Sequence, residues 1–221
     1  NYKNQLLSIF KYTGDVKDSA QYSSITAPIF NGVALKDTKI SKGFGWVKNG
    51  SSIKFNPGIT FSNGKTSEVD ALKAGKVVYV DNDKDFGTTV VVRSDGNTEQ
   101  IAYSGLSASS VKVDQQVQVG DALGKSSSDG KVLVMGISAT TDVSDKLPKR
   151  PKSSIDSDYF DISSMFNIND SNLSKLLKDA NGYDTSKVSS SEEPKEKDFS
   201  KTSEVTFGDY PSTKKQSSAG N

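Results

Sequence analysis

The fold is decided by one stretch, KGFGWVKNGSSIKFNPGITF, which occupies residues 42–61. Two apolar segments within it are separated by Asn49-Gly50, a dipeptide that supplies the positive φ of a tight hairpin turn at low steric cost. The second segment runs into Pro57-Gly58, which predicts a bend before the chain becomes extended again. The stretch therefore predicts a β-hairpin followed directly by another strand.

Outward from this hairpin, residues 25–140 have the texture of an all-β domain. Short apolar or alternating runs are separated every 8 to 12 residues or so by Gly, Asn or Asp, as is typical of antiparallel strands joined by turns. The clearest strands are expected at residues 76–80, 88–93, 99–103 and 132–137. We therefore expect an all-β fold, an antiparallel β-sandwich or open barrel with short peripheral helices.

The flanking segments have a different composition. Residues 1–24 are interpreted as a lead or stalk, compatible with a membrane anchor upstream of the chain, and residues 141–183 as a strap followed by a helix. Asp170 is a candidate N-cap for that helix and Gly182 stands where a C-terminal stop belongs. Residues 184–221 are mostly Ser, Lys, Glu and Thr with isolated aromatics, so we expect a disordered tail.

Two absences from the composition exclude whole classes of chemistry. The 221 residues include no cysteine and no histidine. Disulfides, thiolate nucleophiles, Ser-His triads and histidine-bound zinc are therefore excluded. The lack of cysteine also fits a protein that works outside the cytoplasm of a Gram-positive type of cell. The net charge of +1 offers no electrostatic reason to expect nucleic acid as a partner.

Several blocks of this sequence occur in the order in which they occur in LytM-type domains of the M23 peptidase family, which the chain resembles. The matching blocks include Gly43-Phe44-Gly45-Trp46, Asn56-Pro57-Gly58-Ile59-Thr60-Phe61, Tyr103-Ser104-Gly105-Leu106-Ser107, residues 111–126 and Val132-Leu133-Val134-Met135-Gly136-Ile137. The resemblance covers residues 25–140 and implies the β-fold of that family.

The same resemblance implies that the catalytic site has been lost. Active relatives bind zinc through a His and an Asp of the Asn-Pro-Gly block and the second His of the last block, where this chain has Asn56, Thr60 and Val134. Two further histidines assist with water and the oxyanion, at positions that are Val132 and Gly105 here. Because amide, hydroxyl and hydrocarbon side chains are poor zinc ligands, we expect no metal, no other cofactor and no catalytic residue.

The resemblance thus implies a catalytically inactive, extracytoplasmic M23-like protein. It would act as a scaffold or regulator of peptidoglycan hydrolysis or of an envelope assembly such as a division, sporulation or secretion complex. Its partner would be an envelope protein or peptidoglycan, bound in the former active-site groove. The residues expected to line that groove are Asn56, Thr60, Tyr103, Gly105, Val132 and Val134.

Other interpretations stay open at this point. A glycan- or peptidoglycan-binding β module without a regulatory role could use Phe44, Trp46, Tyr79 and Tyr103 as stacking faces, although aromatics more often fill β cores. The alternating Asp81, Asp83 and Asp85 resemble a calcium loop, but the Gly and Glu that an EF-hand needs are missing, so a solvated turn is the better interpretation.

Overall fold

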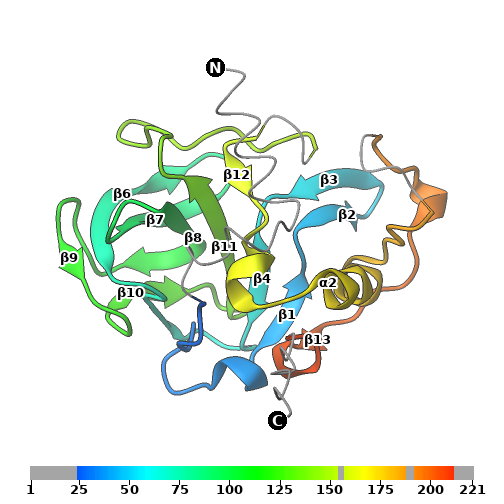
Figure 1. Cartoon of the computed structure of the whole chain (residues 1–221), viewed down its shortest axis with the longest axis horizontal. Coiled ribbons are helices and arrows are strands. Elements are labelled where there is room, and N and C mark those ends of the chain that lie inside the picture. The colour runs from blue at the N-terminus through cyan, green and yellow to red at the C-terminus, as the bar shows by residue number, and fades with distance from the viewer. Residues whose placement is uncertain (1–23, 154–156, 188–191, 212–221) are drawn as a thin grey trace, which may run out of the picture.

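The computed structural model describes residues 24–153, 157–187 and 192–211 (Figure 1). Within these ranges the chain forms one eleven-stranded sheet and a separate two-stranded hairpin, with every strand pair antiparallel. The expected all-β fold class, with short helices at the periphery, is confirmed. The strands are β1 (Lys39–Lys42), β2 (Gly45–Asn49), β3 (Ser52–Asn56), β4 (Ile59–Ser62), β5 (Glu68–Asp70), β6 (Gly75–Asp83), β7 (Gly87–Ser94), β8 (Glu99–Ser109), β9 (Gln116–Val117), β10 (Ala122–Ser126), β11 (Lys131–Ser138), β12 (Tyr159–Phe160) and β13 (Val205–Thr206).

The large sheet has the order β13-β1-β4-β11-β8-β7-β6-β9. Its centre consists of the four strands expected from β-branched runs, now seen as β6, β7, β8 and β11. The long strand β8 pairs with β7 and β11 over most of its length and with β10 near its end. The sheet therefore curls, and the curl encloses the main core.

Both faces of the central strands are buried. Along β11, Val132 and Val134 belong to one apolar cluster, whereas Met135 and Ile137 belong to another on the opposite face. We call the first cluster the inner core; its largest fully buried side chains include Phe30, Phe61, Tyr103, Leu123 and Phe166. We call the second the strap cluster; it consists of Tyr79, Phe86, Val91, Ala102, Met135, Ile137, Val143, Leu147 and Tyr159. Strands covered on both sides read as continuous apolar runs, which matches the sequence here.

The predicted hairpin of residues 42–61 is confirmed as β2 and β3. Asn49 pairs with Ser52, so the loop consists of Gly50 and Ser51, and of these two only Gly50 has a positive φ, +62°. This is the geometry of a type II′ turn, in which the first central position favours glycine. The hairpin is held by its own small cluster, in which the ring of Phe55 contacts those of Phe44 and Trp46 edge-on.

The predicted helix is present, but its N-cap lies one residue earlier than expected. Helix α2 spans Asp170–Leu176, and its N-cap is Asn169, whose side chain accepts a hydrogen bond from the backbone N–H of Asn172. Asp170 lies in the first turn instead, where its charge still suits the helix dipole. The helix continues as a π-helical turn, Leu177–Asn181, and ends at Gly182 with φ +68°, as expected for a left-handed C-cap.

The prediction that residues 184–221 are disordered is wrong for residues 192–211. There β13 pairs with β1, and Phe207 and Tyr210 are buried. The rings of Phe61 and Phe166 lie 6.4 and 5.9 Å from the ring of Phe207. Few apolar residues suffice because each one enters a core that the β-domain has already formed.

Other parts of the predicted division of the chain are not decided by the structure. Residues 1–23, 188–191 and 212–221, which include most of the predicted lead and the end of the tail, lie outside the described residues. The boundaries at residues 140 and 183 stay predictions.

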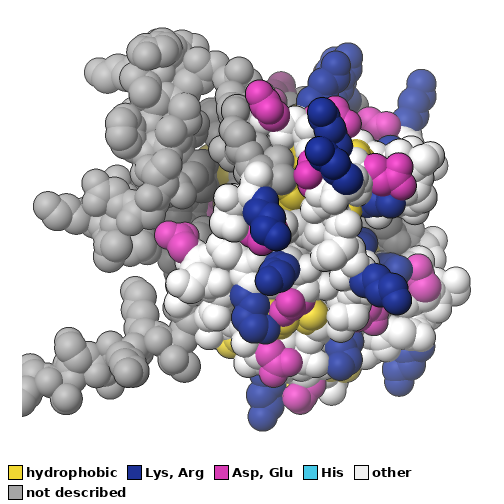
Figure 2. All heavy atoms as spheres, turned by 90° about the vertical axis from the view of Figure 1, so that its right-hand side faces the viewer, with side chains coloured by type: hydrophobic (Ala, Val, Ile, Leu, Met, Phe, Trp, Pro, Cys, Tyr) yellow, Lys and Arg dark blue, Asp and Glu magenta, His cyan; other side chains and the backbone are white. Residues whose placement is uncertain are grey.

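Two general surface properties bear on function. No helix in the described ranges is long and apolar enough to cross a membrane. Figure 2 shows basic and acidic side chains interspersed over the face at the right of Figure 1, rather than a field of one sign. Some of these charges pair with each other, for example Lys48 with Glu196 and Lys175 with Asp179, each at 2.9 Å.

Replacing Phe207 with Ala tests the ordered C-terminal segment. The truncation leaves a cavity between Phe61 and Phe166, so we expect the free energy of unfolding to fall by about 3 kcal/mol. Chemical denaturation measures this change. The matched control is Lys201→Ala in the same segment, at an exposed position, which should change stability by less than about 0.5 kcal/mol. Equal, negligible effects of both substitutions would contradict the docking of this segment.

Candidate functional site

The strand pairing places Thr60 at the centre of one sheet face. Thr60 on β4 is directly opposite Leu133 on β11, which is in turn opposite Ser104 on β8. Residues opposite each other in adjacent strands point to the same face. The face that carries Thr60 therefore also carries Leu133 and Ser104, and these two residues were not among the predicted groove positions.

Three of the six predicted groove residues lie on the opposite face. Val134 is opposite Ile59 and Tyr103, and Val132 is opposite Phe61, all in the inner core. The prediction that Val132, Val134 and Tyr103 line a groove with Thr60 is therefore wrong. The assumed register of β11 was off by one residue, and such a slip moves every side chain of a strand to the other face.

Tyr103 has a structural role in the inner core. Its side chain is fully buried, and its hydroxyl oxygen accepts a hydrogen bond of 2.9 Å from the backbone N–H of Leu72. Burial raises the pKa of this hydroxyl far above its ordinary value, so it stays protonated. Tyr103 thus fixes the turn between β5 and β6 and is not free to contact a ligand.

The side chain of Asn56 also has a structural role, because it binds two backbone carbonyls. Its side-chain amide donates to the carbonyls of Gly43, at 3.1 Å, and Gly58, at 3.0 Å. Asn181, at the end of the π-helical turn, binds Gly43 from the other side, accepting from its N–H at 2.8 Å and donating to its carbonyl at 3.1 Å. These two buried asparagines join the hairpin, the bend after it and the C-terminal helix. Asn181 was not anticipated from the sequence.

Gly105 is the one predicted groove residue that is exposed. Its φ is +77°, which favours glycine, and its N–H donates to the carbonyl of Phe86 at 3.0 Å. A Cβ at this position would meet no atom within 4 Å, so the conformation rather than crowding selects glycine here. Gly105, within β8, thus binds the turn between β6 and β7.

The face that carries Thr60 is covered by part of the chain itself. We call residues 141–153 the strap; its Val143 and Leu147 are buried in the strap cluster against Met135 and Ile137. The side-chain amide of Gln100 donates to the carbonyls of Ser138 and Thr141, at 2.9 and 2.8 Å, and so fixes the start of the strap. In Figure 1 the chain passes from the end of β11 along the upper edge of the sheet before it returns as β12.

Arg150 joins the strap to both sides of the predicted site. One guanidinium nitrogen donates to the carbonyl of Phe55, the residue before Asn56, at 3.2 Å. The guanidinium carbon also lies 4.8 Å from the centre of the Phe86 ring, on the residue whose carbonyl binds Gly105. Burial lowers the pKa of Arg150, although a guanidinium keeps its charge at any ordinary pH. Arg150 therefore places a permanent positive charge between Phe55 on β3 and Phe86 in the turn after β6.

These residues do not fit a zinc ion. Thr60 offers only a neutral hydroxyl, Leu133 offers no lone pair, and Asn56, whose NH₂ group binds two carbonyls, offers only a neutral amide oxygen. Within the described parts of the chain no group of three His, Cys, Asp or Glu side chains is close enough to hold a metal. The buried Ser104 hydroxyl on this face is occupied by Thr89, at 2.7 Å between the two oxygens. The face is built for packing and hydrogen bonding.

The aromatic residues considered as sugar-stacking faces are buried. Phe44, Trp46, Tyr79 and Tyr103 are all less than 10% exposed. They fill the cores, so the stacking interpretation is wrong for them. The Asp81–Asp85 segment is the end of β6 and the start of the turn to β7, where Asp83 accepts hydrogen bonds from the backbone N–H groups of Asp85 and Phe86.

Residues 54–142 match the family model described as Peptidase family M23. The resemblance of this chain to the M23 family is confirmed. The matched M23-like segment contains β4 to β11, Thr60, Leu133, Ser104 and the first residues of the strap. Arg150, Tyr159 and Asn181 lie outside it.

Solved structures of M23-type proteins resemble the M23-like domain at low sequence identity. The catalytic domain of the antimicrobial peptidase lysostaphin from Staphylococcus simulans is 18% identical, with a TM-score of 0.48 over 60% of this chain and 94% of that one. A chain of the SpoIIQ–SpoIIIAH pore-forming complex is 19% identical, with a TM-score of 0.46 over 53% of this chain and 85% of that one. None of the curated protein sequences matches this chain.

The strand pairing of β11 predicts that a histidine substitution destabilises the protein much more at Val134 than at the neighbouring Leu133. Val134→His places an imidazole in the inner core without a partner, so we expect a loss of about 3 kcal/mol or more in the free energy of unfolding. Leu133→His adds the same group on the half-buried opposite face and should cost about 1 kcal/mol. Urea denaturation of both variants measures the difference. A larger loss for Leu133→His would contradict the observed strand pairing and indicate that Leu133, rather than Val134, faces the inner core.

Arg150 is expected to hold the strap in place. Arg150→Met removes the charged hydrogen bond to Phe55 and the contact with the Phe86 ring, and should lower the free energy of unfolding by about 1–3 kcal/mol. A lysine-specific protease should also cleave faster after Lys146, Lys149 or Lys152. The control is Lys84→Met, at an exposed position. Unchanged cleavage and stability would mean that Arg150 does not secure the strap.

Proposed function

We propose that this chain is a catalytically inactive M23-like domain that works by binding rather than by hydrolysis. The proposal rests on the sheet face that carries Thr60, Leu133 and Ser104, which we call the former zinc face. Thr60 pairs with Leu133, which pairs with Ser104, and Asn56 binds backbone carbonyls. The strap packs on the same face against Met135 and Ile137, and Arg150 binds the carbonyl of Phe55. No histidine exists anywhere in the chain to replace the missing ligands. Without a metal there is no activated water for peptide hydrolysis.

The proposed setting is the cell envelope, where the domain would be a scaffold or regulator of peptidoglycan hydrolysis or of an envelope assembly. This proposal is supported by the family match together with the loss of ligand residues in a fold that otherwise keeps its strands. A protein partner is favoured over a glycan strand because the candidate stacking aromatics are buried. The face that carries Thr60 is less suited to a partner, since the strap packs on part of it against Met135 and Ile137.

Metal content and hydrolysis test the proposal together. Protein dialysed against zinc should contain far less than one zinc per chain by mass spectrometry, and incubation with purified peptidoglycan should release no new amino groups. Lysostaphin, treated in parallel, serves as the positive control. Stoichiometric zinc accompanied by release of amino groups would refute the inactive assignment.

A further inference from the structure

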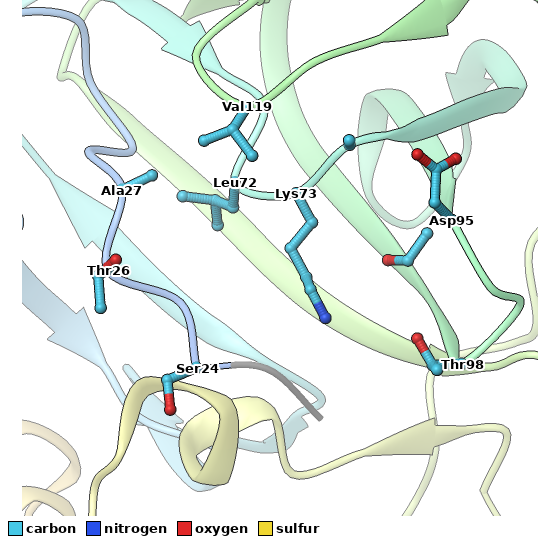
Figure 3. Close-up of a pocket in the computed structure, with 10 residues that line it drawn as sticks. Ser24, Thr26, Ala27, Leu72, Lys73, Asp95, Thr98 and Val119 are labelled. Atoms are coloured by element: carbon cyan, nitrogen blue, oxygen red, sulfur yellow. The ribbon is translucent and has the colours of Figure 1, made fainter. Parts of the chain in front are cut away.

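A hollow away from the zinc face has the features of a binding site. It has a volume of about 490 Å³ and lies between the chain before β1, the β5–β6 turn, the β7–β8 turn and the loop before β10. Figure 3 shows Lys73 extending into this hollow, with Ser24 and Thr26 on one side and Asp95 and Thr98 on the other. Neither the family match nor the predicted site assigns a role to these residues.

Lys73 and Ser94, which line the hollow, connect it to buried polar groups that lack partners in the described structure. Lys73 forms an ion pair of 2.8 Å with one carboxylate oxygen of Glu99, which is completely buried. Among the residues that the structure describes, the other Glu99 oxygen and the hydroxyl of Ser94 have no hydrogen-bond partner. Ser94 lines the hollow and is only 3% exposed. An unpartnered buried polar group is costly, so a ligand that supplies donors here gains affinity by satisfying it.

The wall of the hollow is aliphatic. Ala27, Leu72, Ala74 and Val119 contribute to it, and none of its ten lining residues is aromatic. Val119 is 54% exposed and, with Val113 at 50%, is one of the two large apolar side chains exposed within the described ranges. A wall of this kind suits small aliphatic side chains, whereas sugar rings usually stack on aromatic faces.

The charges around the hollow further restrict the class of ligand that it can bind. Lys73 is neutralised by Glu99, and Asp95 adds a second carboxylate on the wall. The three groups sum to a charge of −1, which disfavours acidic ligands. Stem peptides of peptidoglycan carry several carboxylates. A neutral or basic peptide segment is therefore favoured over peptidoglycan.

We propose that this hollow binds a short, neutral or basic segment of a protein partner with a small aliphatic side chain. The backbone N–H and C=O groups of the segment would bond to Ser94 and Lys73, which line the hollow, and its aliphatic side chain would contact Leu72 and Val119. The inference rests on the proposed function, because it gives the inactive domain a place to bind its partner.

The test is an NMR titration of the full chain with two blocked peptides that differ in one charge. Acetyl-Ala-Val-Ala-Lys-amide should produce saturable shifts at residues 72–74, 94–98 and 119 at millimolar concentrations. Acetyl-Ala-Val-Ala-Glu-amide should bind several-fold more weakly. Shifts elsewhere on the domain, no saturation, or tighter binding of a purified muropeptide would overturn the proposal.

Two variants separate binding from folding. Val119→Ser should weaken binding of the lysine peptide about five-fold, and the matched Val113→Ser, an equally exposed valine outside the hollow, should not. Ser94→Ala should weaken binding without lowering Tm, because the hydroxyl has no partner within the described structure. Equal binding by all variants would contradict the site. If the peptide fails to bind a protein that also lacks zinc and hydrolysis, this inference fails and the proposed function stands.

Discussion

The structure depends on the burial of both faces of β11. A strand in the middle of an antiparallel sheet commonly has one face on the core and one in water. Here Val132 and Val134 enter the inner core, while Met135 and Ile137 enter the strap cluster on the other side. The second face therefore needs a cover, and the chain supplies one from residues 141–153. The strap thus packs on the same sheet face as Thr60 and Leu133, against Met135 and Ile137.

Two buried asparagines have structural roles at the junction of the hairpin and the C-terminal segment. Asn56 binds the carbonyls of Gly43 and Gly58, and Asn181 binds Gly43 from the C-terminal helix. A neutral amide can donate twice to carbonyls, which neither a metal-bound imidazole nor a carboxylate can do. The two asparagines thus connect the hairpin to the C-terminal segment. That segment adds β13 to the sheet edge at β1, which protects the edge from pairing with other chains.

Much of the fold could be predicted from local sequence signals. The predictions that failed depend on how residues far apart in the sequence pack together. The strands at β6, β7, β8 and β11, the turn at Gly50 and the stop at Gly182 are set by β-branched runs and by glycines with positive φ. The run from Val132 to Ile137 is apolar apart from one glycine, so alternation could not say which side chains face the site, and Leu133 was missed. Nor does composition reveal that Phe207 meets Phe61, or that Arg150 binds Phe55 from 95 residues away.

The most direct test of the account is a crystal structure of the protein grown with zinc, with anomalous data collected at the zinc absorption edge. The account predicts the Arg150 guanidinium beside the Phe55 carbonyl and the Phe86 ring, the strap in place over Met135 and Ile137, and no anomalous peak next to Thr60. A zinc peak bound by Thr60 or Asn56, with the strap displaced from the sheet, would contradict it.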